Sequence, residues 1–205
     1  MSTTTTEVLI IGAGLSGAVA ALHLAKAGIA VTCLEQGQWN DPEDYPGNKA
    51  DFELQALGAW HANPNIRDAD ADYAILDDTS DIKPMLYNGV GGSTILYSAH
   101  WMRFLPGDFC VRSLDGVGED WPISYQDLQP YYDRVQEFVG MSGDASQEPW
   151  RPPGAPYPLP PIPKFRHAEL LEKGFRSKGI PVSPIPITVL SRPYKGRPAC
   201  IWDGW

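Results

Sequence analysis

The chain has 205 residues, of which 43% are hydrophobic and 11% aromatic, and its formal net charge is −9. This length suits one domain, or one domain and part of another, and the apolar content favours a globular core over disorder. The negative charge argues against non-specific binding to nucleic acid or to anionic lipid. No apolar run is long enough for a membrane span, and the polar residues 1–7 do not resemble a secretion signal, so we expect a cytoplasmic protein.

Residues 8–37 predict a strand, a glycine-rich turn, a helix and a second strand, in that order. Residues 8–11 are apolar without alternation, which is typical of a central parallel strand buried on both faces. The helix is expected over 15–27 and the second strand over 30–34. This order is that of a β-α-β unit that holds a dinucleotide.

The turn between the first strand and the helix has the spacing Gly-x-Gly-x-x-Gly. Gly12 permits the tight turn, Gly14 lets the backbone approach a pyrophosphate, and Gly17 lets the helix pack closely on the sheet. The helix that begins at Leu15 would direct its free N–H groups at the phosphates. Glu35 ends the second strand, where a carboxylate can accept hydrogen bonds from ribose hydroxyls and would disfavour a 2′-phosphate. This stretch leaves open whether the ligand is FAD or NAD.

The middle of the chain contains a second glycine-rich element. A short helix is predicted over residues 51–61, followed by an acidic, loop-like stretch over 63–81 that lacks the glycine and closing glutamate of a calcium-binding loop and reads as a solvated face. Residues 88–94 then read Asn-Gly-Val-Gly-Gly-Ser-Thr. Because glycine pairs let a backbone pass very close to a ligand, this element predicts a second contact that a simple NAD-binding domain does not need.

The second half of the chain predicts two helices and a linker. A helix is expected over 120–139 with Ser124 as its N-cap. Its apolar positions follow helical spacing and are interpreted as core: Leu128, Tyr131, Tyr132, Val135 and Phe138. Residues 148–163 carry eight prolines and predict an extended, semi-rigid linker. A short amphipathic helix over 167–178 and a strand over 181–190 follow, and the prolines in that strand place it at a sheet edge.

Residues 12–37 together with 88–103 resemble the glucose–methanol–choline oxidoreductases. Further stretches are similar to the gluconate- and sugar-dehydrogenase-like branch of that family: 63–67, 106–109, 120–124 and 131–132. The resemblance runs over nearly the whole chain. It implies a flavoprotein with FAD in a Rossmann-like domain, and a second domain that covers the flavin and binds an alcohol or a sugar.

The resemblance implies cofactor-binding roles for both glycine motifs and for the segment after the second one. The first turn would contact the pyrophosphate and the acid the adenosine ribose; the second motif would follow the pyrophosphate and ribityl chain, and the segment after it would lie near the isoalloxazine. The candidate residues are Gly12, Gly14, Leu15, Ser16, Gly17, Glu35, Gly89, Gly91, Gly92, Ser93, Tyr97, Ser98 and His100.

Three further expectations follow from the resemblance. Some family members attach the flavin covalently to a histidine where this chain has Leu96, so we predict non-covalent FAD. The family's catalytic base is a histidine near its C-terminus, which takes the hydroxyl proton while hydride passes to flavin N5; nothing here matches it, and we assign no catalytic residue. Cys200 stands where some relatives have a cysteine cluster, but a lone thiol predicts no metal site.

We therefore predict an α/β fold in which residues 1–124 form a Rossmann-like FAD-binding part with a parallel sheet, and residues 125–205 begin a substrate domain. The predicted function is FAD-dependent oxidation of CH–OH groups in alcohols or sugars. The aromatic ending without a polar tail favours a piece of a longer protein, and we expect that piece alone to be inactive and poorly stable. A flavin-binding module without catalysis is one alternative. The other is an NAD-dependent dehydrogenase or a two-dinucleotide flavin reductase, which would require another Gly-x-Gly-x-x-Gly unit. The substrate and the electron acceptor stay open.

Overall fold

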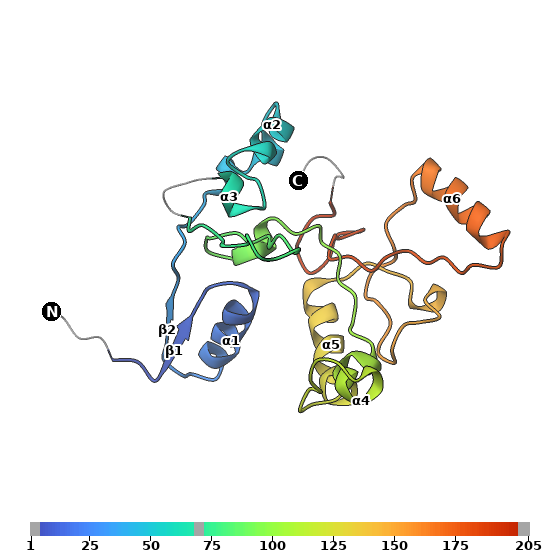
Figure 1. Ribbon diagram of the computed structural model, residues 1–205, viewed down its shortest axis with the longest axis horizontal. Helices are drawn as coiled ribbons and strands as arrows, with labels where there is room; N and C mark the ends of the chain where they lie inside the picture. The colour runs from blue at the N-terminus through green and yellow to red at the C-terminus, as the bar shows by residue number, and fades with distance from the viewer. Residues whose placement is uncertain (1–4, 68–71, 201–205) are drawn as a thin grey trace. The chain divides into compact units, whose positions relative to one another are not determined.

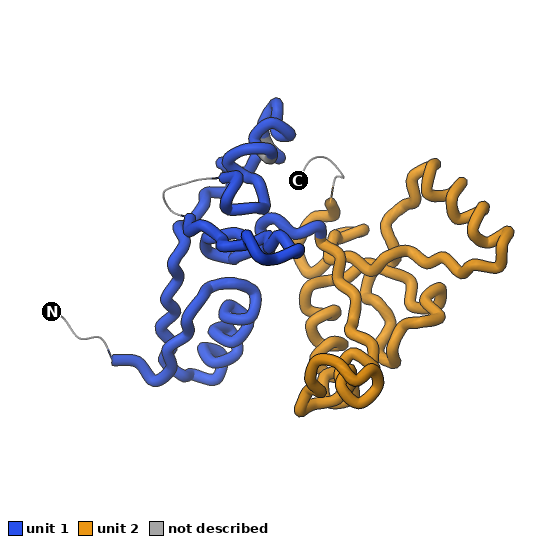
Figure 2. The backbone as a smooth tube through the Cα atoms, viewed as in Figure 1, with its two compact units in different colours: residues 1–98, 203–205 blue, residues 99–202 orange. Residues whose placement is uncertain are grey.

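The computed structural model describes residues 5–67 and 72–200. The chain forms two compact units, one up to Ser98 and one from Ala99 onward, which Figure 2 colours separately. The functional boundary expected after residue 124 is a different division of the chain, and it stays a prediction.

The first unit opens with a β-α-β element (Figure 1). Strand β1 spans Val8–Ile11, helix α1 spans Leu15–Lys26 and strand β2 spans Val31–Leu34. The two strands pair in parallel, with Val8 opposite Val31. The order strand, turn, helix, strand is therefore confirmed, and with it the α/β fold.

The two strands are not buried on both faces as expected for a central strand. Ile11 is 84% exposed, Leu34 54% and Leu9 52%. The sheet has two strands within the described ranges, and a parallel sheet hides its apolar side chains only where further strands and helices cover it. The expectation of two-sided burial for residues 8–11 is therefore wrong for this structure.

Short helices connect β2 to the second glycine motif. Helix α2 spans Phe52–Leu57, inside the stretch where a helix was expected, and α3 spans Pro64–Arg67, at the start of the stretch interpreted as loop. Single 3₁₀ turns lie at Pro42–Asp44, Pro46–Asn48 and Gly92–Ile95.

Arg67 holds the middle of this unit together. Its side chain is 3% exposed, it pairs with Asp72 at 2.9 Å, and it donates to the Leu86 carbonyl at 3.1 Å. The guanidinium also lies over the ring of Tyr87, 5.1 Å from the ring centre. Asp72 is therefore ion-paired rather than part of a solvated face; residues 68–71 of that acidic stretch lie outside the described residues.

Helix α5, Tyr125–Val139, is the longest helix that the described part of the second unit contains. The Ser124 hydroxyl accepts the Asp127 N–H at 3.3 Å, and the Asp127 carboxylate accepts the Ser124 N–H at 2.8 Å. This reciprocal capping box confirms the predicted N-cap. Gly140, with φ +80°, ends the helix in the left-handed region.

The buried face of α5 differs from the predicted apolar stripe. Tyr125 and Gln136 are buried, whereas Tyr131 and Phe138 are 57% and 58% exposed. The interpretation as core is therefore wrong at these two positions. Arg103 is buried against the helix and bonds to polar side chains of α5. The face that carries these polar side chains is therefore the buried one.

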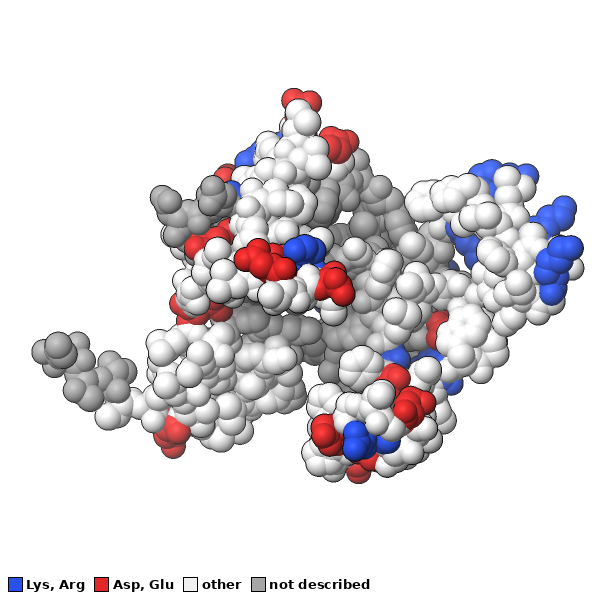
Figure 3. All heavy atoms as spheres, in the orientation of Figure 1, with Lys and Arg blue, Asp and Glu red and all other residues white. Residues whose placement is uncertain are grey.

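The remaining elements of the second unit are short. Helix α4 spans Val111–Asp115, α6 spans Arg166–Arg176, and 3₁₀ turns lie at Pro106–Phe109 and Ala145–Gln147. Figure 3 shows basic side chains gathered over α6. None of the helices described for this chain is long and apolar enough to cross a membrane.

Residues 148–163 contain no helix or strand. Leu159 among them is buried and exchanges backbone hydrogen bonds with Met141 and Gly143, and the role of the segment as a linker stays a prediction. The strand expected over 181–190 is reduced to isolated bridges, in which Ile187 pairs with His100 and with the buried Ser142. Pro184 and Pro186 have no N–H to donate, so a continuous ladder does not form here.

Candidate functional site

The first glycine turn disfavours side chains at two points, at Gly12 because of its backbone conformation and at Gly17 because there is no space. Gly12 has φ +96°, and its N–H donates to the Leu34 carbonyl at 2.7 Å. A Cβ on Gly17 would lie 2.0 Å from the Gly12 carbonyl oxygen, so α1 begins directly against the end of β1. A Cβ on Gly14, in contrast, would meet no atom within 4 Å. The protein itself therefore leaves the space over Gly14 open.

The N-terminus of α1 is available to an anion. Gly14 occupies the N-cap and supplies no side-chain cap, and the first turn carries no acidic residue. The first N–H groups of a helix have no partner within the helix, and the helix dipole adds partial positive charge there. This arrangement is the one that binds phosphate groups at helix N-termini.

Glu35 connects the turn to the end of β2. Its Oε1 accepts the Gly37 N–H at 2.8 Å and its Oε2 accepts the Ala13 N–H at 2.6 Å. These backbone donors, Gly37 first and Ala13 second, lower the pKa of Glu35 against the opposing effect of desolvation. The carboxylate is therefore ionised at neutral pH. Its oxygens keep lone pairs that can accept hydrogen bonds from ribose hydroxyls.

The second glycine motif lies directly on the first turn. The Gly91 N–H donates to the Ala13 carbonyl at 2.9 Å, and Gly91 forms a parallel bridge with Gly14. A Cβ on Gly92 would lie 3.3 Å from the Cα of Gly14. The structure thus brings together two motifs that are far apart in the sequence.

The loop after β2 completes this cluster. The Val90 N–H donates to the Gln38 carbonyl at 3.1 Å, and a Cβ on Gly37 would lie 2.2 Å from the amide nitrogen of Gly89. Sequence reasoning missed the backbone roles of Ala13 and Gln38. Gly37, two residues after Glu35, was the one local signal of this close approach.

The other candidate residues lie at the edge of this cluster or in the second unit. Leu15 and Ser16 are exposed in the first turn of α1. The Ser93 hydroxyl accepts a backbone N–H of the preceding loop at 3.2 Å, while Tyr97 and Ser98 are exposed near the end of the first unit. His100 lies in the second unit. The cofactor role of each residue stays a prediction.

Comparison with known proteins agrees with this geometry. The family described as an FAD binding domain matches residues 5–52. The 2-methyl-1,2-propanediol dehydrogenase of Mycolicibacterium austroafricanum is 35% identical over 97% of this chain and 36% of its own length. The fructose dehydrogenase large subunit of Gluconobacter japonicus is 31% identical over 97% of this chain and 39% of its own. The chain thus spans about a third of the length of these curated relatives.

A solved structure has the same fold. The crystal structure of pyridoxine 4-oxidase from Mesorbium loti superposes with a TM-score of 0.54 over 90% of this chain and 37% of its own, at 19% identity. An identity this low shows the fold alone.

The fold, the glycine cluster and the family match agree on an FAD-binding domain within the first unit, at residues 5–52. More particularly, its relatives confirm the resemblance to the glucose–methanol–choline oxidoreductases, including the gluconate- and sugar-dehydrogenase-like branch.

Proposed function

We propose that this chain holds FAD in an enzyme that oxidises CH–OH groups of alcohols or sugars. The observation that carries the proposal is the meeting of both glycine motifs at the uncapped N-terminus of α1, beside the ionised Glu35. The relatives named for propanediol, fructose and gluconate support the substrate class. The isoalloxazine, when FAD is bound, supplies the acceptor for a hydride.

Each part of the cluster has a task in holding the cofactor. The N–H groups at the start of α1 bind the pyrophosphate, and Glu35 accepts hydrogen bonds from the adenosine ribose. Gly91 and Gly92 let the backbone follow the cofactor closely, because neither presents a side chain. Ser93, Tyr97, Ser98 and His100 are the proposed contacts toward the flavin end.

We further propose that the flavin is held without a covalent bond. Leu96 takes the position at which the resemblance implies a histidine linkage, and an alkyl side chain has no nucleophilic atom. Acid precipitation of the whole protein should leave the yellow colour in the supernatant. Colour that stays with the denatured pellet would contradict this part of the proposal.

The main test is the cofactor content and turnover of the whole protein that contains this chain. We expect flavin absorbance bands in the purified protein and their bleaching by an alcohol or sugar without oxygen. Flavin that no such compound reduces would favour a binding module without catalysis, and purification with NAD in place of flavin would overturn the proposal. The cytoplasmic location stays a prediction, which fractionation of the native host tests.

A further inference from the structure

A buried ion pair of the first unit lies beside the segment that leads into the second glycine motif, residues 88–94. Nε of Arg67 lies 2.9 Å from one carboxylate oxygen of Asp72, and Nη2 lies 3.0 Å from the other. The two side chains are 3% and 10% exposed. Because two parallel hydrogen bonds join the groups, the plane of the guanidinium is fixed as well as its position.

The third nitrogen of the Arg67 guanidinium joins two stretches of backbone. Nη1 donates to the carbonyl oxygen of His61 at 2.5 Å and to that of Leu86 at 3.1 Å. The Leu86 N–H donates in turn to the Ala62 carbonyl at 3.0 Å. Leu86 stands three residues before Gly89, so the chain enters the second glycine motif from a fixed point.

Tyr87 connects Arg67 to the motif itself. Cζ of the arginine lies 5.1 Å from the centre of the Tyr87 ring, and the ring stacks on Trp60 with 5.7 Å between the ring centres. A Cβ on Gly89 would lie 2.8 Å from Cε1 of Tyr87, so the ring packs directly on the backbone of the motif. The Tyr87 N–H also donates to the Ser93 hydroxyl at 3.2 Å.

The motif needs such support because glycine leaves its backbone free to move. Gly91 and Gly92 have φ of +99° and +59°, and neither has a side chain that could anchor it. The Val90 N–H donates to the Gln38 carbonyl, and the Gly91 N–H donates to the Ala13 carbonyl. Holding glycines in one conformation costs more conformational entropy than holding any other residue. Rigid contacts directly before the motif therefore favour the position in which these two bonds form.

We propose that Arg67, through Asp72 and Tyr87, is a positioning residue that sets the second glycine motif on the first turn and thereby raises the affinity for the cofactor. The effect on cofactor affinity rests on the proposed flavin function. The order of the motif is a property of the chain itself and is measured separately.

The test is hydrogen–deuterium exchange of the whole protein, compared between the native form and Arg67→Lys. A lysine keeps the charge but has one nitrogen, so it cannot bond both Asp72 oxygens and two carbonyls at once. We expect exchange over residues 88–94 to become about tenfold faster, because local opening of the motif becomes easier. Exchange over residues 8–13, where the Gly12 N–H is bonded inside the β-α-β element, should keep its rate. Equal acceleration of both segments, or of neither, overturns the proposal.

Tyr87 variants test the ring contact and keep the proposal testable if Arg67→Lys does not fold. Tyr87→Leu removes the ring that packs on Gly89 and should speed up exchange over residues 88–94 selectively. Tyr87→Phe keeps the ring and should have the native exchange pattern. Native exchange in Tyr87→Leu would contradict the proposal.

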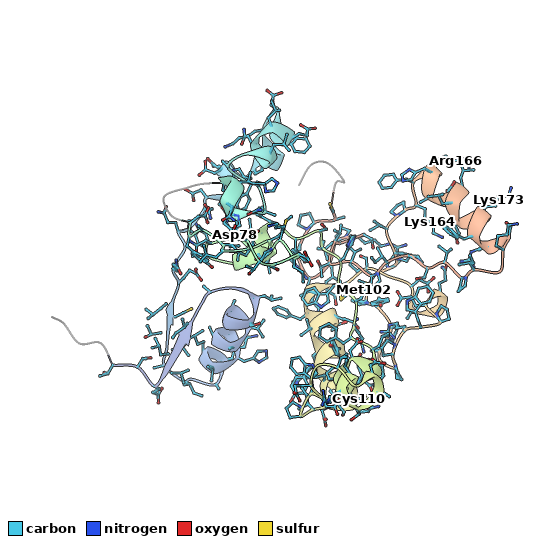
Figure 4. The ribbon with its side chains drawn as sticks, viewed as in Figure 1. Asp78, Met102, Cys110, Lys164, Arg166 and Lys173 are labelled. Atoms are coloured by element: carbon cyan, nitrogen blue, oxygen red, sulfur yellow. The ribbon has the colours of Figure 1, made fainter. Side chains whose placement is uncertain are left out.

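Lys83→Met is the matched control in the same unit. Lys83 is 58% exposed and pairs at 3.2 Å with Asp77, which directly precedes Asp78, labelled in Figure 4. Exposed pairs contribute little to stability, so exchange over residues 88–94 should stay native. Acceleration as large as that of Arg67→Lys would overturn the proposal.

Flavin affinity of the same variants is the second readout. Arg67→Lys and Tyr87→Leu should bind FAD about tenfold or more weakly, while Tyr87→Phe and Lys83→Met bind it normally. Selective exchange with native affinity contradicts the effect on the cofactor. If the native protein binds no flavin, the proposed function fails, and the exchange over residues 88–94 still decides whether Arg67 positions the motif.

Discussion

The two units build their polar sites in opposite ways. In the first unit the cluster consists of backbone atoms brought together where side chains are absent, as at Gly17 and Gly91. In the second unit the polar network depends on large side chains, with Arg103 bonded to Asp133, 30 residues further along the chain. A site made of glycines can be predicted from a short sequence motif. A site made of side chains that are distant in the sequence depends on how the chain packs.

The largest effect is expected where the side-chain network is cut. Arg103→Met removes the partner of Asp133, Gln136 and the Tyr125 hydroxyl, and hydrogen bonds to charged groups contribute about 1.5–3 kcal/mol each. We expect the second unit to lose about 3 kcal/mol of unfolding free energy in chemical denaturation, with flavin binding unchanged.

Arg166→Met is the control for that variant, because Arg166 is 80% exposed and pairs only at the surface with Glu169. Its loss should change the stability by less than about 1 kcal/mol. Equal destabilisation by the two variants would remove the contrast between a buried network and a surface pair.

The reverse experiment targets the first unit. Gly17→Ala places a methyl group 2.0 Å from the Gly12 carbonyl oxygen, a backbone atom that cannot swing away. Overpacking of this kind costs about 1–3 kcal/mol, and we expect flavin binding to fall with it while the second unit keeps its stability. A Gly17→Ala protein that binds flavin normally would show that the tight approach of α1 to β1 is not needed.

A smaller effect is expected at a position where local sequence rules suffice. Ser124→Ala removes the hydroxyl that accepts the Asp127 N–H, and loss of an N-cap costs about 1 kcal/mol. Thermal unfolding of the second unit should show this change. Ser124→Thr, which keeps the hydroxyl both as acceptor of the Asp127 N–H and as donor to the Asp127 carboxylate, should restore most of it.

The smallest expected effect is the pH dependence of the first unit. Backbone donors from Gly37 and Ala13 lower the pKa of Glu35, so its contribution to stability is complete above the ordinary carboxyl pKa. That contribution is lost as the pH falls through the lowered value of the folded state. Glu35→Gln should flatten this acid dependence in thermal unfolding. Identical acid profiles for the two proteins would contradict the role of Glu35 in tying the turn to β2.

The sequence predicts the first unit well because its signals are local. The spacing of Gly12, Gly14 and Gly17 sets a turn and a helix start, and Glu35 marks the end of the next strand. The exposure of Ile11 and Leu34 could not be predicted, because apolar runs report a preference for burial and not what covers them.

The second unit contains features that local sequence patterns do not predict. The helical spacing over α5 predicted the helix, its cap at Ser124 and its end, although the helix begins at Tyr125 rather than at residue 120. It did not identify which face is buried. Arg103 decides this by binding Asp133 and Gln136, and no pattern in the sequence announces a pairing over 30 residues. Glu148, where the predicted linker begins, is likewise buried and accepts the Tyr157 hydroxyl.

The central claim, that a cofactor phosphate occupies the space over Gly14, is tested by comparing Gly14→Ala with Gly174→Ala in the whole protein. A Cβ at either position meets no protein atom within 4 Å and neither glycine has positive φ, so both variants should fold with nearly normal stability. We predict that Gly14→Ala binds FAD about tenfold or more weakly, while Gly174→Ala binds it normally. Normal flavin affinity in a folded Gly14→Ala protein would contradict the account.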